Sequence, residues 1–422
     1  MKKFLQSPLA SSSLVLMISM TVVNAGNYVY NLILGRWLGP ALFADLSLIV
    51  TLLLVITFVT VPLQMTTARY AAIHLADGNL AALAATRLWA QRMAIGFGLL
   101  FVAIFALGSP LWQAFFKTAS PIPFIIFGIA LPFSLLQGVE RGTLQGQMRF
   151  GVLAVTYQVE MWSRLLIGVG LVALGMSVNG AVLGISLSFV ATWLSARLAV
   201  GNRLPAAVFP EKETRAALTA FALPVLVSQL GQILINNSDV LLVRCFYPAE
   251  TAGQYAALAL IGRIVFFATW SVVTTMFPIV AQKHKKGEPH RHLLWASLGI
   301  VASISVPIVF LTLTFPESIV NLLFGKQYTG VASLLWLYAL ATSLYALANV
   351  VVNYRLSLGA GKSTGLVIAA GTAQILGIVL FHASLAQVVW VQVDVMAALF
   401  ILLLGYYFIS EKSAGTQPKQ TA

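Results

Sequence analysis

Five of the charged residues inside long apolar stretches of this sequence could do chemistry, because an uncompensated charge is costly there. Glu160 and Arg164 are four positions apart, so in a helix they lie on one face and can form an ion pair. Arg263 has no acid at a helical spacing, and its partner must come from another helix or from an anionic ligand. Asp239 and Asp394 are isolated acids. Together with Glu160 they are candidate sites for a coupling cation or proton, and buried structural ion pairs are the alternative.

A second pattern is a stripe of polar side chains on each of two segments that lie 208 positions apart. The polar positions step by 3, 4 and 3 residues, which places them on one face of a helix. The same shift aligns Arg36 with Arg244, so the stripes indicate an internal repeat. They either join helices by hydrogen bonds or line a water-filled cleft between the two halves. The presence of equivalent stripes in both halves favours the cleft, because a symmetric cavity needs matching walls. The stripe residues are Thr21, Asn24, Tyr28 and Asn31, then Gln229, Gln232, Asn236 and Asp239.

The composition shows which kind of structure must position these residues. Of the 422 residues, 59% are hydrophobic and only 9% are charged, whereas about 25% are charged in a typical soluble domain. Lipid is therefore the expected solvent, and apolar stretches of about 20 residues without strict alternation indicate helices. The net charge of +13 lies in the short polar segments, which favours a membrane protein and argues against a nucleic-acid partner.

The apolar stretches predict an all-α integral membrane protein with about twelve transmembrane helices. We expect two six-helix bundles, 1–205 and 206–410, related by a pseudo-twofold axis along the membrane normal, and a disordered tail at 411–422. With the N-terminus inside, 19 of the 25 Lys and Arg residues, Arg141 among them, fall in cytoplasmic segments, so both termini are expected in the cytoplasm. The predicted helices are 11–34, 43–66, 93–110, 120–138, 152–174, 178–199, 217–243, 252–280, 293–314, 331–354, 364–382 and 386–409.

The polar segments give no indication of an enzyme. The outer loops are short, and neither a nucleophile–base pair nor paired carboxylates occur at one membrane face. His284, His290 and His292 read as a basic loop rather than a metal site, because the loop has no cysteine and only one acid, Glu288. We therefore expect no enzymatic activity, no cofactor and no metal. Residues 79–92 are expected to form a separate interfacial helix.

Four segments, in order and spacing, resemble one known family. They are LGRWLGP at 34–40, RGTLQG at 141–146, NSDVLLV at 237–243 with AGQYA at 252–256, and LFG at 323–325 with ANVVVNY at 348–354. The chain resembles the polysaccharide and O-antigen flippase branch of the multidrug/oligosaccharidyl-lipid/polysaccharide (MOP) exporter superfamily. Each segment is loosely specific alone, and their joint order over most of the chain makes the resemblance.

The resemblance implies export of a polyprenyl-diphosphate-linked oligosaccharide across the bacterial cytoplasmic membrane by alternating access. The implied partners are this lipid-linked sugar, membrane lipids, and a polymerase or glycosyltransferases of the same pathway. A diphosphate calls for arginines, so Arg263 is a candidate ligand with Arg36 and Arg244 as outer partners. The remaining cavity candidates, which would contact the sugar, are Asn24, Tyr28, Asn31, Gln232, Asn236 and Asp239.

Two alternative functions stay open at the level of the sequence. One is a cation-coupled small-molecule antiporter of the same superfamily, although the first helix lacks an acidic residue. The other is a non-transporting membrane subunit of a polysaccharide synthesis complex.

Overall fold

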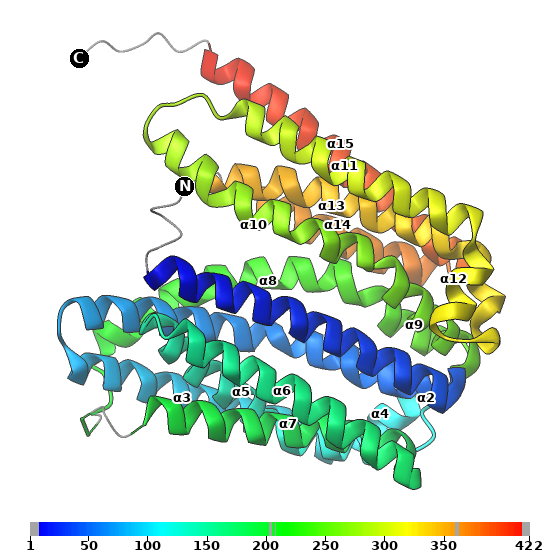
Figure 1. Ribbon diagram of the computed structural model, residues 1–422, viewed down its shortest axis with the longest axis horizontal. Helices are drawn as coiled ribbons and strands as arrows, with labels where there is room; N and C mark the ends of the chain where they lie inside the picture. The colour runs from blue at the N-terminus through cyan, green and yellow to red at the C-terminus, as the bar shows by residue number, and fades with distance from the viewer. Residues whose placement is uncertain (1–7, 202–204, 207, 359–362, 416–422) are drawn as a thin grey trace. The chain divides into compact units, whose positions relative to one another are not determined.

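Every regular element that the structure describes is helical. The computed structural model describes residues 8–201, 205–206, 208–358 and 363–415 (Figure 1). The chain divides into two compact units, Met1–Gln229 (unit 1) and Leu230–Ala422 (unit 2). The boundary lies within helix α8 (Lys212–Phe246). A helical architecture is expected in lipid, because a helix satisfies its backbone polar groups internally.

Helix α2 (Pro8–Ala76) contains two of the predicted membrane helices, 11–34 and 43–66. It is broken at Gly39, whose φ of 74° and ψ of 169° lie outside the helical region. Glycine adopts a positive φ without steric cost, and Pro40 has no backbone N–H to donate to the preceding turn. The chain reverses its direction at this break, at the end of the dark blue segment in Figure 1.

The other helices of unit 1 follow one another with short connections. Two π-helical segments, η1 and η2, extend α3 and α6, and the short helix α4 was not predicted from the sequence. The elements are α3 (Leu80–Val102), η1 (Ala103–Leu107), α4 (Ser109–Phe116), α5 (Ile122–Gly146), α6 (Phe150–Leu171), η2 (Val172–Met176), α7 (Ser177–Val200) and the first part of α8.

The prediction of a separate interfacial helix at 79–92 is wrong. Asn79 caps α3 by accepting a hydrogen bond from the backbone N–H of Ala82, and the helix then continues unbroken to its end. Leu83 and Trp89 are buried, and α3 packs against α5. An interfacial helix keeps one face in water, but this part of α3 buries its side chains within unit 1.

Helix α5 is the packing centre of unit 1 and contacts α2, α3 and α7. Its approach to α2 depends on glycine, because a Cβ on Gly142 would clash with the carbonyl oxygen of Gln64. A Cβ on Gly138 would lie 2.8 Å from Cγ2 of Thr60. Small residues let membrane helices approach closely enough for van der Waals packing to stabilise them. The buried Arg141 directly precedes Gly142, so this packing places a charge in the interior of the unit.

Unit 2 begins in the second part of α8. The predicted membrane helix 252–280 is in fact two helices, α9 and α10, which meet at Arg263. A 3₁₀ segment, η3, precedes α13, and α12 is a further short helix. The elements are α9 (Ala249–Gly262), α10 (Ile264–Lys285), α11 (Arg291–Thr314), α12 (Pro316–Leu323), η3 (Lys326–Leu334), α13 (Leu335–Ser357), α14 (Ser363–Leu380) and α15 (Leu385–Gly415).

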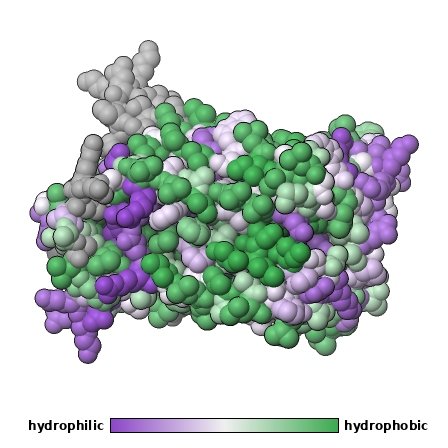
Figure 2. Space-filling view, turned by 90° about the horizontal axis from the view of Figure 1, so that it is seen from below, coloured by the Kyte–Doolittle hydropathy of each residue, from purple (hydrophilic) through white to green (hydrophobic). Residues whose placement is uncertain are grey.

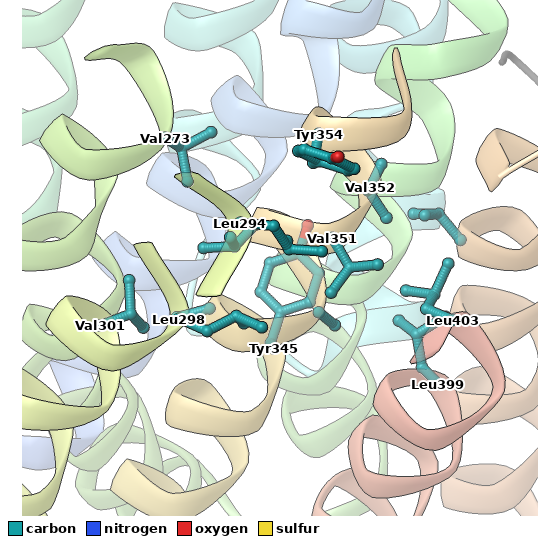
Figure 3. Packing of buried hydrophobic residues seen from close by; sticks show 14 of the residues in the cluster. Val273, Leu294, Leu298, Val301, Tyr345, Val351, Val352, Tyr354, Leu399 and Leu403 are labelled. Carbon is teal, nitrogen blue, oxygen red and sulfur yellow. The ribbon is translucent and has the colours of Figure 1, made fainter. Parts of the chain in front are cut away.

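Helix α13 is the packing centre of unit 2 and contacts α10, α11 and α15. Buried apolar side chains from these four helices, with a few from α8 and α14, form one cluster, which includes Val273, Leu298, Val351 and Leu403 (Figure 3). The cluster fixes the position of α13, and α13 supplies one of the tyrosines of the polar network described below.

The described helices are long and apolar enough for a membrane protein. Among the residues that the structure describes, nine stretches qualify as membrane spans by length and composition, and Gly365–Leu380 is a shorter apolar helix. Val15–Ala76 and Phe150–Val200 are 62 and 51 residues long, and each contains two predicted membrane helices. Figure 2 shows apolar side chains across the middle of one face and hydrophilic side chains toward its ends. The chain is a multi-pass membrane protein of two helical bundles, as predicted, and the twofold axis stays a prediction.

Candidate functional site

Two arginines share one glutamate inside unit 1. Glu160 on α6 accepts a hydrogen bond from Arg164 Nη2 at 2.6 Å through Oε1. Its other oxygen, Oε2, lies 2.7 Å from Nη1 of Arg141 on α5. The pair of Glu160 with Arg164 is the one that the sequence predicts, and this prediction is confirmed. Two positive charges and one negative charge leave this cluster with a net charge of +1.

The excess charge lies deep within a membrane helix. Glu160 is ten residues from the start of α6 at Phe150, which corresponds to about 15 Å along a helix. The side chains of Arg141, Glu160 and Arg164 are 6%, 17% and 14% exposed. No second described acid forms an ion pair with either arginine. A net charge at this depth is costly, so the cluster is suited to receive an anion.

Helix α2 lies against this cluster and contributes polar groups. Nη1 of Arg164 donates to Oδ1 of Asn27 at 3.2 Å. The helices approach closely at Gly26, where a Cβ would clash with Sδ of Met161 on α6. The Tyr28 hydroxyl and the Nε of Arg164 are buried without a hydrogen-bond partner among the described residues. Buried donors are usually paired, so these two are available to the oxygen atoms of a ligand.

Arg141 is the more firmly held of the two arginines. Its Nε donates to Oγ1 of Thr156 at 3.2 Å, and its Nη2 donates to the Thr156 carbonyl at 2.9 Å. Its guanidinium carbon lies 3.9 Å from the centroid of the Tyr157 ring, and Gln64 donates to the Tyr157 hydroxyl at 3.2 Å. Every guanidinium nitrogen of Arg141 therefore has an acceptor, and this side chain joins α5 to α6.

A second buried acid of unit 1 has a structural arrangement. Glu140 is fully buried on α5 and accepts from Arg87 at 2.7 and 2.9 Å and from Gln91 at 2.8 Å, both on α3. Arg197 on α7 lies 3.9 Å away and is half exposed. Glu140 thus joins three helices. Glu160, in contrast, binds Arg164, whose Nε has no hydrogen-bond partner among the described residues.

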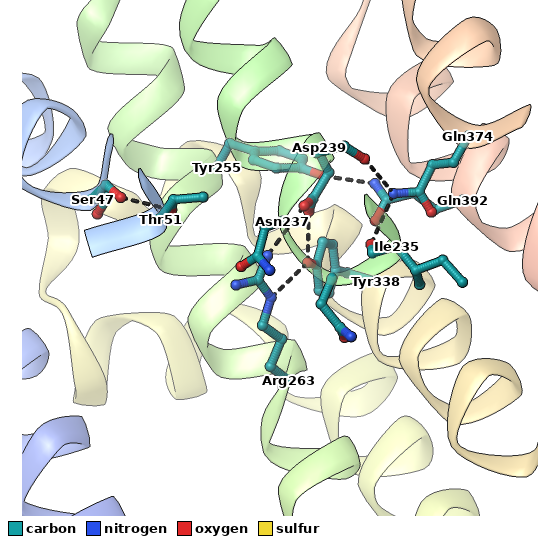
Figure 4. A network of polar contacts seen from close by, with 12 residues as sticks. Ser47, Thr51, Ile235, Asn237, Asp239, Tyr255, Arg263, Tyr338, Gln374 and Gln392 are labelled. Carbon is teal, nitrogen blue, oxygen red and sulfur yellow. Dashed lines mark hydrogen bonds and ion pairs between the residues drawn. The ribbon is translucent and has the colours of Figure 1, made fainter. Parts of the chain in front are cut away.

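Unit 2 contains a closed polar network. Asp239 on α8 accepts from Arg263 Nη2 at 3.1 Å, from the Tyr338 hydroxyl at 2.7 Å and from the Tyr255 hydroxyl at 3.1 Å (Figure 4). Gln392 donates to the Tyr255 hydroxyl at 2.7 Å. Of the two partners that the sequence leaves open for Arg263, the structure shows the fixed acid. One positive and one negative charge cancel here.

Comparison with known proteins identifies the family of this chain. Residues 33–333, about 71% of the chain, match the profile of a family described as "Polysaccharide biosynthesis protein". The chain belongs to this family. A search of curated protein sequences gave no match.

Solved structures show that this polysaccharide biosynthesis protein has a MOP-type fold. An inward-facing multidrug resistance MATE family transporter of the MOP superfamily matches with a TM-score of 0.78 at 14% identity, over 91% of this chain and 95% of the other. The lipid II flippase MurJ matches in an inward closed conformation with a TM-score of 0.73 at 12% identity, over 94% and 87%. A MOP superfamily transporter from Pyrococcus furiosus, described as having a binding pocket of reverse polarity, matches with a TM-score of 0.60 at 15% identity. The match covers 96% of this chain and 97% of the other. The resemblance stated from the sequence is therefore confirmed for family and fold.

In this family member the first polar stripe is only partly buried. Asn24 is exposed, and Tyr28 and Asn31 are half-buried. Asn31 donates to the carbonyl of Asn27 at 2.8 Å. Arg36 is exposed and takes part in an interaction of its own. Asn27, which binds Arg164, lies on the same helix as the stripe but is not part of it. The role of the stripe as a cavity wall stays a prediction.

The second polar stripe leads into the unit 2 network. Gln232 and Asn236 are half-buried, and Asn236 donates to the Gln232 carbonyl at 2.8 Å and to the Tyr345 hydroxyl at 3.4 Å. Arg244, at the far end of α8, is buried and has an interaction partner. Asp394 on α15 is exposed and makes no hydrogen bond or ion pair with another described residue. Asp394 stays a candidate for ion coupling, and it is separate from the Asp239 network.

Sequence reasoning missed Arg141 as a site residue, because it ended the predicted membrane helix at residue 138, and this end is wrong. Helix α5 continues to Gly146, and Arg141 is buried within it. The glycines at 138, 142 and 146 recur every four residues and could have indicated a packed membrane helix here. Tyr255 and Tyr338 were also missed, and no local signal marks them, because each reaches Asp239 from a different helix.

Proposed function

We propose that this protein moves a lipid-linked oligosaccharide across the bacterial cytoplasmic membrane by alternating access. The observation that carries the proposal is the net positive cluster of Arg141, Glu160 and Arg164 within the membrane helices of unit 1. Membership of a polysaccharide biosynthesis family and a MOP-type fold support it. Both termini are proposed to lie in the cytoplasm, and the protein acts as a transporter rather than an enzyme.

The diphosphate of such a substrate needs a cation in an apolar environment. Arginine suits this role, because its planar fork donates two parallel hydrogen bonds to phosphate oxygens. We assign this role to Arg164, which keeps a buried Nε without a partner among the described residues. Arg263 is the weaker candidate, because Asp239 already balances its charge. Arg36 and Arg244 remain candidates for contacts near the helix ends.

The sugar of the substrate needs amide and hydroxyl partners. The Tyr28 hydroxyl is a buried donor without a described partner, and Tyr28 follows Asn27, which binds Arg164, in the sequence of α2. We therefore propose that the sugar lies along the first polar stripe, with Tyr28 nearest to the diphosphate. Asn24 and Asn31 continue this stripe, and Gln232 and Asn236 supply equivalent groups in unit 2. Membrane lipids surround the polyprenyl chain, and a polymerase or glycosyltransferases act before or after transport.

A complementation experiment tests this function. In a strain that lacks the protein, the wild-type gene is expected to restore surface glycan and to remove accumulated lipid-linked oligosaccharide from the inner leaflet. Arg164→Ala should lower glycan roughly 10- to 100-fold, because it removes hydrogen bonds to a charged group. Arg164→Lys keeps the charge without the fork and should be less impaired.

The matched control is Arg197→Ala, which removes a half-exposed arginine outside the cluster and should leave transport close to the wild-type level. Protein levels in the membrane are compared by blot for every variant. Normal surface glycan in the strain without the protein would reject the proposed function. Full activity of Arg164→Ala at normal protein level would show that Arg164 does not bind the substrate.

A further inference from the structure

We propose that Glu160 is an internal competitor of the substrate, a carboxylate that occupies Arg164 until the substrate's phosphate takes its place. The nature of the anion rests on the proposed function, and the exchange itself rests on the geometry of unit 1. The site is the donor surface of Arg164, whose Nη1 binds Asn27 and whose Nε has no described partner. Its ligand class is a phosphate or diphosphate group.

The two oxygen atoms of Glu160 have different partners. Oε2 binds Arg141 at 2.7 Å, and Oε1 binds Arg164 at 2.6 Å. One oxygen can therefore lose its arginine while the other keeps its own. When a phosphate binds Arg164, the carboxylate remains paired with Arg141, and no buried charge is left without a partner. Breaking a buried pair is strongly destabilising when it leaves one charge alone, and this arrangement avoids that cost.

The two arginines differ in the number of donors that they have available. Arg141 uses Nε and Nη2 on Thr156 and Nη1 on Glu160, so it has no nitrogen without an acceptor. Arg164 uses Nη1 on Asn27 and Nη2 on Glu160, and its Nε has no described partner. Arg141 therefore serves as the anchor of the carboxylate, and Arg164 is the arginine that exchanges its anion.

The exchange requires little rearrangement of the helices. Glu160 and Arg164 lie one turn apart on α6, so a change of side-chain rotamer separates them. They are also the two most exposed members of the cluster, at 17% and 14%, against 6% for Arg141. The pair that opens thus lies on the more accessible side, and the pair that stays closed is the more buried one.

Competition by Glu160 lowers the affinity of Arg164 for the substrate, so that the substrate can be released after transport. A phosphate must displace the carboxylate to bind, and the returning carboxylate helps to expel the phosphate after transport. Without Glu160, the substrate should bind more tightly and leave more slowly. A purely structural glutamate would behave differently, because its loss would weaken binding, transport and stability together.

The experiment measures binding to purified full-length protein in detergent by isothermal titration calorimetry. The probes are farnesyl diphosphate and inorganic diphosphate. Glu160→Gln should lower the dissociation constants of both probes about tenfold, because the carboxylate that competes with them for Arg164 is gone. The same variant should lower surface glycan in the complementation assay. Glu140→Gln is the matched control, because it removes another buried acid beside two arginines and should not tighten binding.

A second variant separates competition from a simple gain of positive charge. Arg141→Gln together with Glu160→Gln keeps the net charge of the cluster at +1 and leaves Arg164 without its competitor. It should also bind both probes more tightly than the wild type. If this double variant binds them equally or more weakly, the inference is overturned. Since inorganic diphosphate carries no lipid or sugar, tighter binding of this probe supports the exchange even if the complementation assay rejects the proposed function.

Discussion

Units 1 and 2 align by the internal repeat, but they place their charges at different positions. The shift of 208 residues pairs Glu160 with Ile368 and Arg164 with Thr372, so α14 of unit 2 has no counterpart of the charged pair on α6. Arg141 of α5 aligns with Asn349 of α13. Among the described residues, the net positive cluster therefore has no counterpart at the equivalent positions of unit 2. The repeat preserves polar positions and aligns Arg36 with Arg244, whereas these buried ion pairs differ between the two halves.

The unit 2 network has the opposite character. The same shift pairs Asp239 with Asn31 and Arg263 with Val55, so unit 1 has no counterpart of this ion pair. In unit 2 the two charges balance, and two tyrosines satisfy the carboxylate further. A hydrogen-bonded network without net charge specifies the packing of helices, whereas a buried cluster with a net charge is suited to bind a ligand of opposite charge. The comparison predicts a structural role for Asp239 and Arg263 of unit 2 and a binding role for the Glu160 cluster of unit 1.

The largest effect is expected when the unit 2 network loses its acid. Asp239→Ala leaves Arg263 buried without its counter-charge, and such a loss costs about 3–5 kcal/mol. Unfolding in mixed micelles, titrated with SDS, measures this change. Adding Arg263→Met to the same chain should recover part of the stability. A stable Asp239→Ala single variant would show that Asp239 does not hold α8 to its neighbours.

A smaller effect is expected where the two units differ in packing. Gly142 of α5 aligns with Val350 of α13, and a side chain at Gly142 would clash with the Gln64 carbonyl. Gly142→Val should destabilise unit 1 by about 1–3 kcal/mol, because overpacking forces the helices apart. It should also lower transport, because α5 positions Arg141. SDS-titrated unfolding measures the first effect and surface glycan the second.

The matched control for this variant is Gly96→Val in α3, where a Cβ meets nothing within 4 Å. This change should leave both measurements near their wild-type values. Equal destabilisation by the two variants would mean that valine is poorly tolerated in these helices in general, and that the close approach of α2 and α5 has no special weight.

The sequence was sufficient for the helices and insufficient for the contacts between them. Apolar length predicted that the described part of the chain consists of membrane helices, because lipid imposes the same requirement on each of them. The i,i+4 spacing of Glu160 and Arg164 predicted their pair, because both lie on one helix. The partner of Arg263 stayed open, since Asp239 lies on another helix and only packing decides which acid it meets.

Arg141 shows why the positive-inside count cannot locate every arginine. A count of basic residues assigns charges to loops, but α5 continues past the apolar stretch that was used to predict it. Glycine packing against α2 and the carboxylate of Glu160 make burial of Arg141 possible, and both contacts are long-range. The breaks at Gly39 and Arg263 are of two kinds: a Gly-Pro sequence marks the first, while nothing local marks the second.

The smallest effect is expected when the whole ion pair of unit 2 is replaced by neutral amides. Asp239→Asn with Arg263→Gln removes both charges together and keeps hydrogen-bonding groups for Tyr255 and Tyr338. Replacing both partners of a buried pair is often nearly neutral, so stability should fall by no more than about 2 kcal/mol. Surface glycan per unit of membrane protein should stay within roughly twofold of the wild type, since Arg164 is the proposed diphosphate ligand and Asp239 already balances the charge of Arg263. A loss of glycan as large as that of Arg164→Ala, at normal protein level, would place Arg263 in the substrate site and remove the functional contrast between the two units.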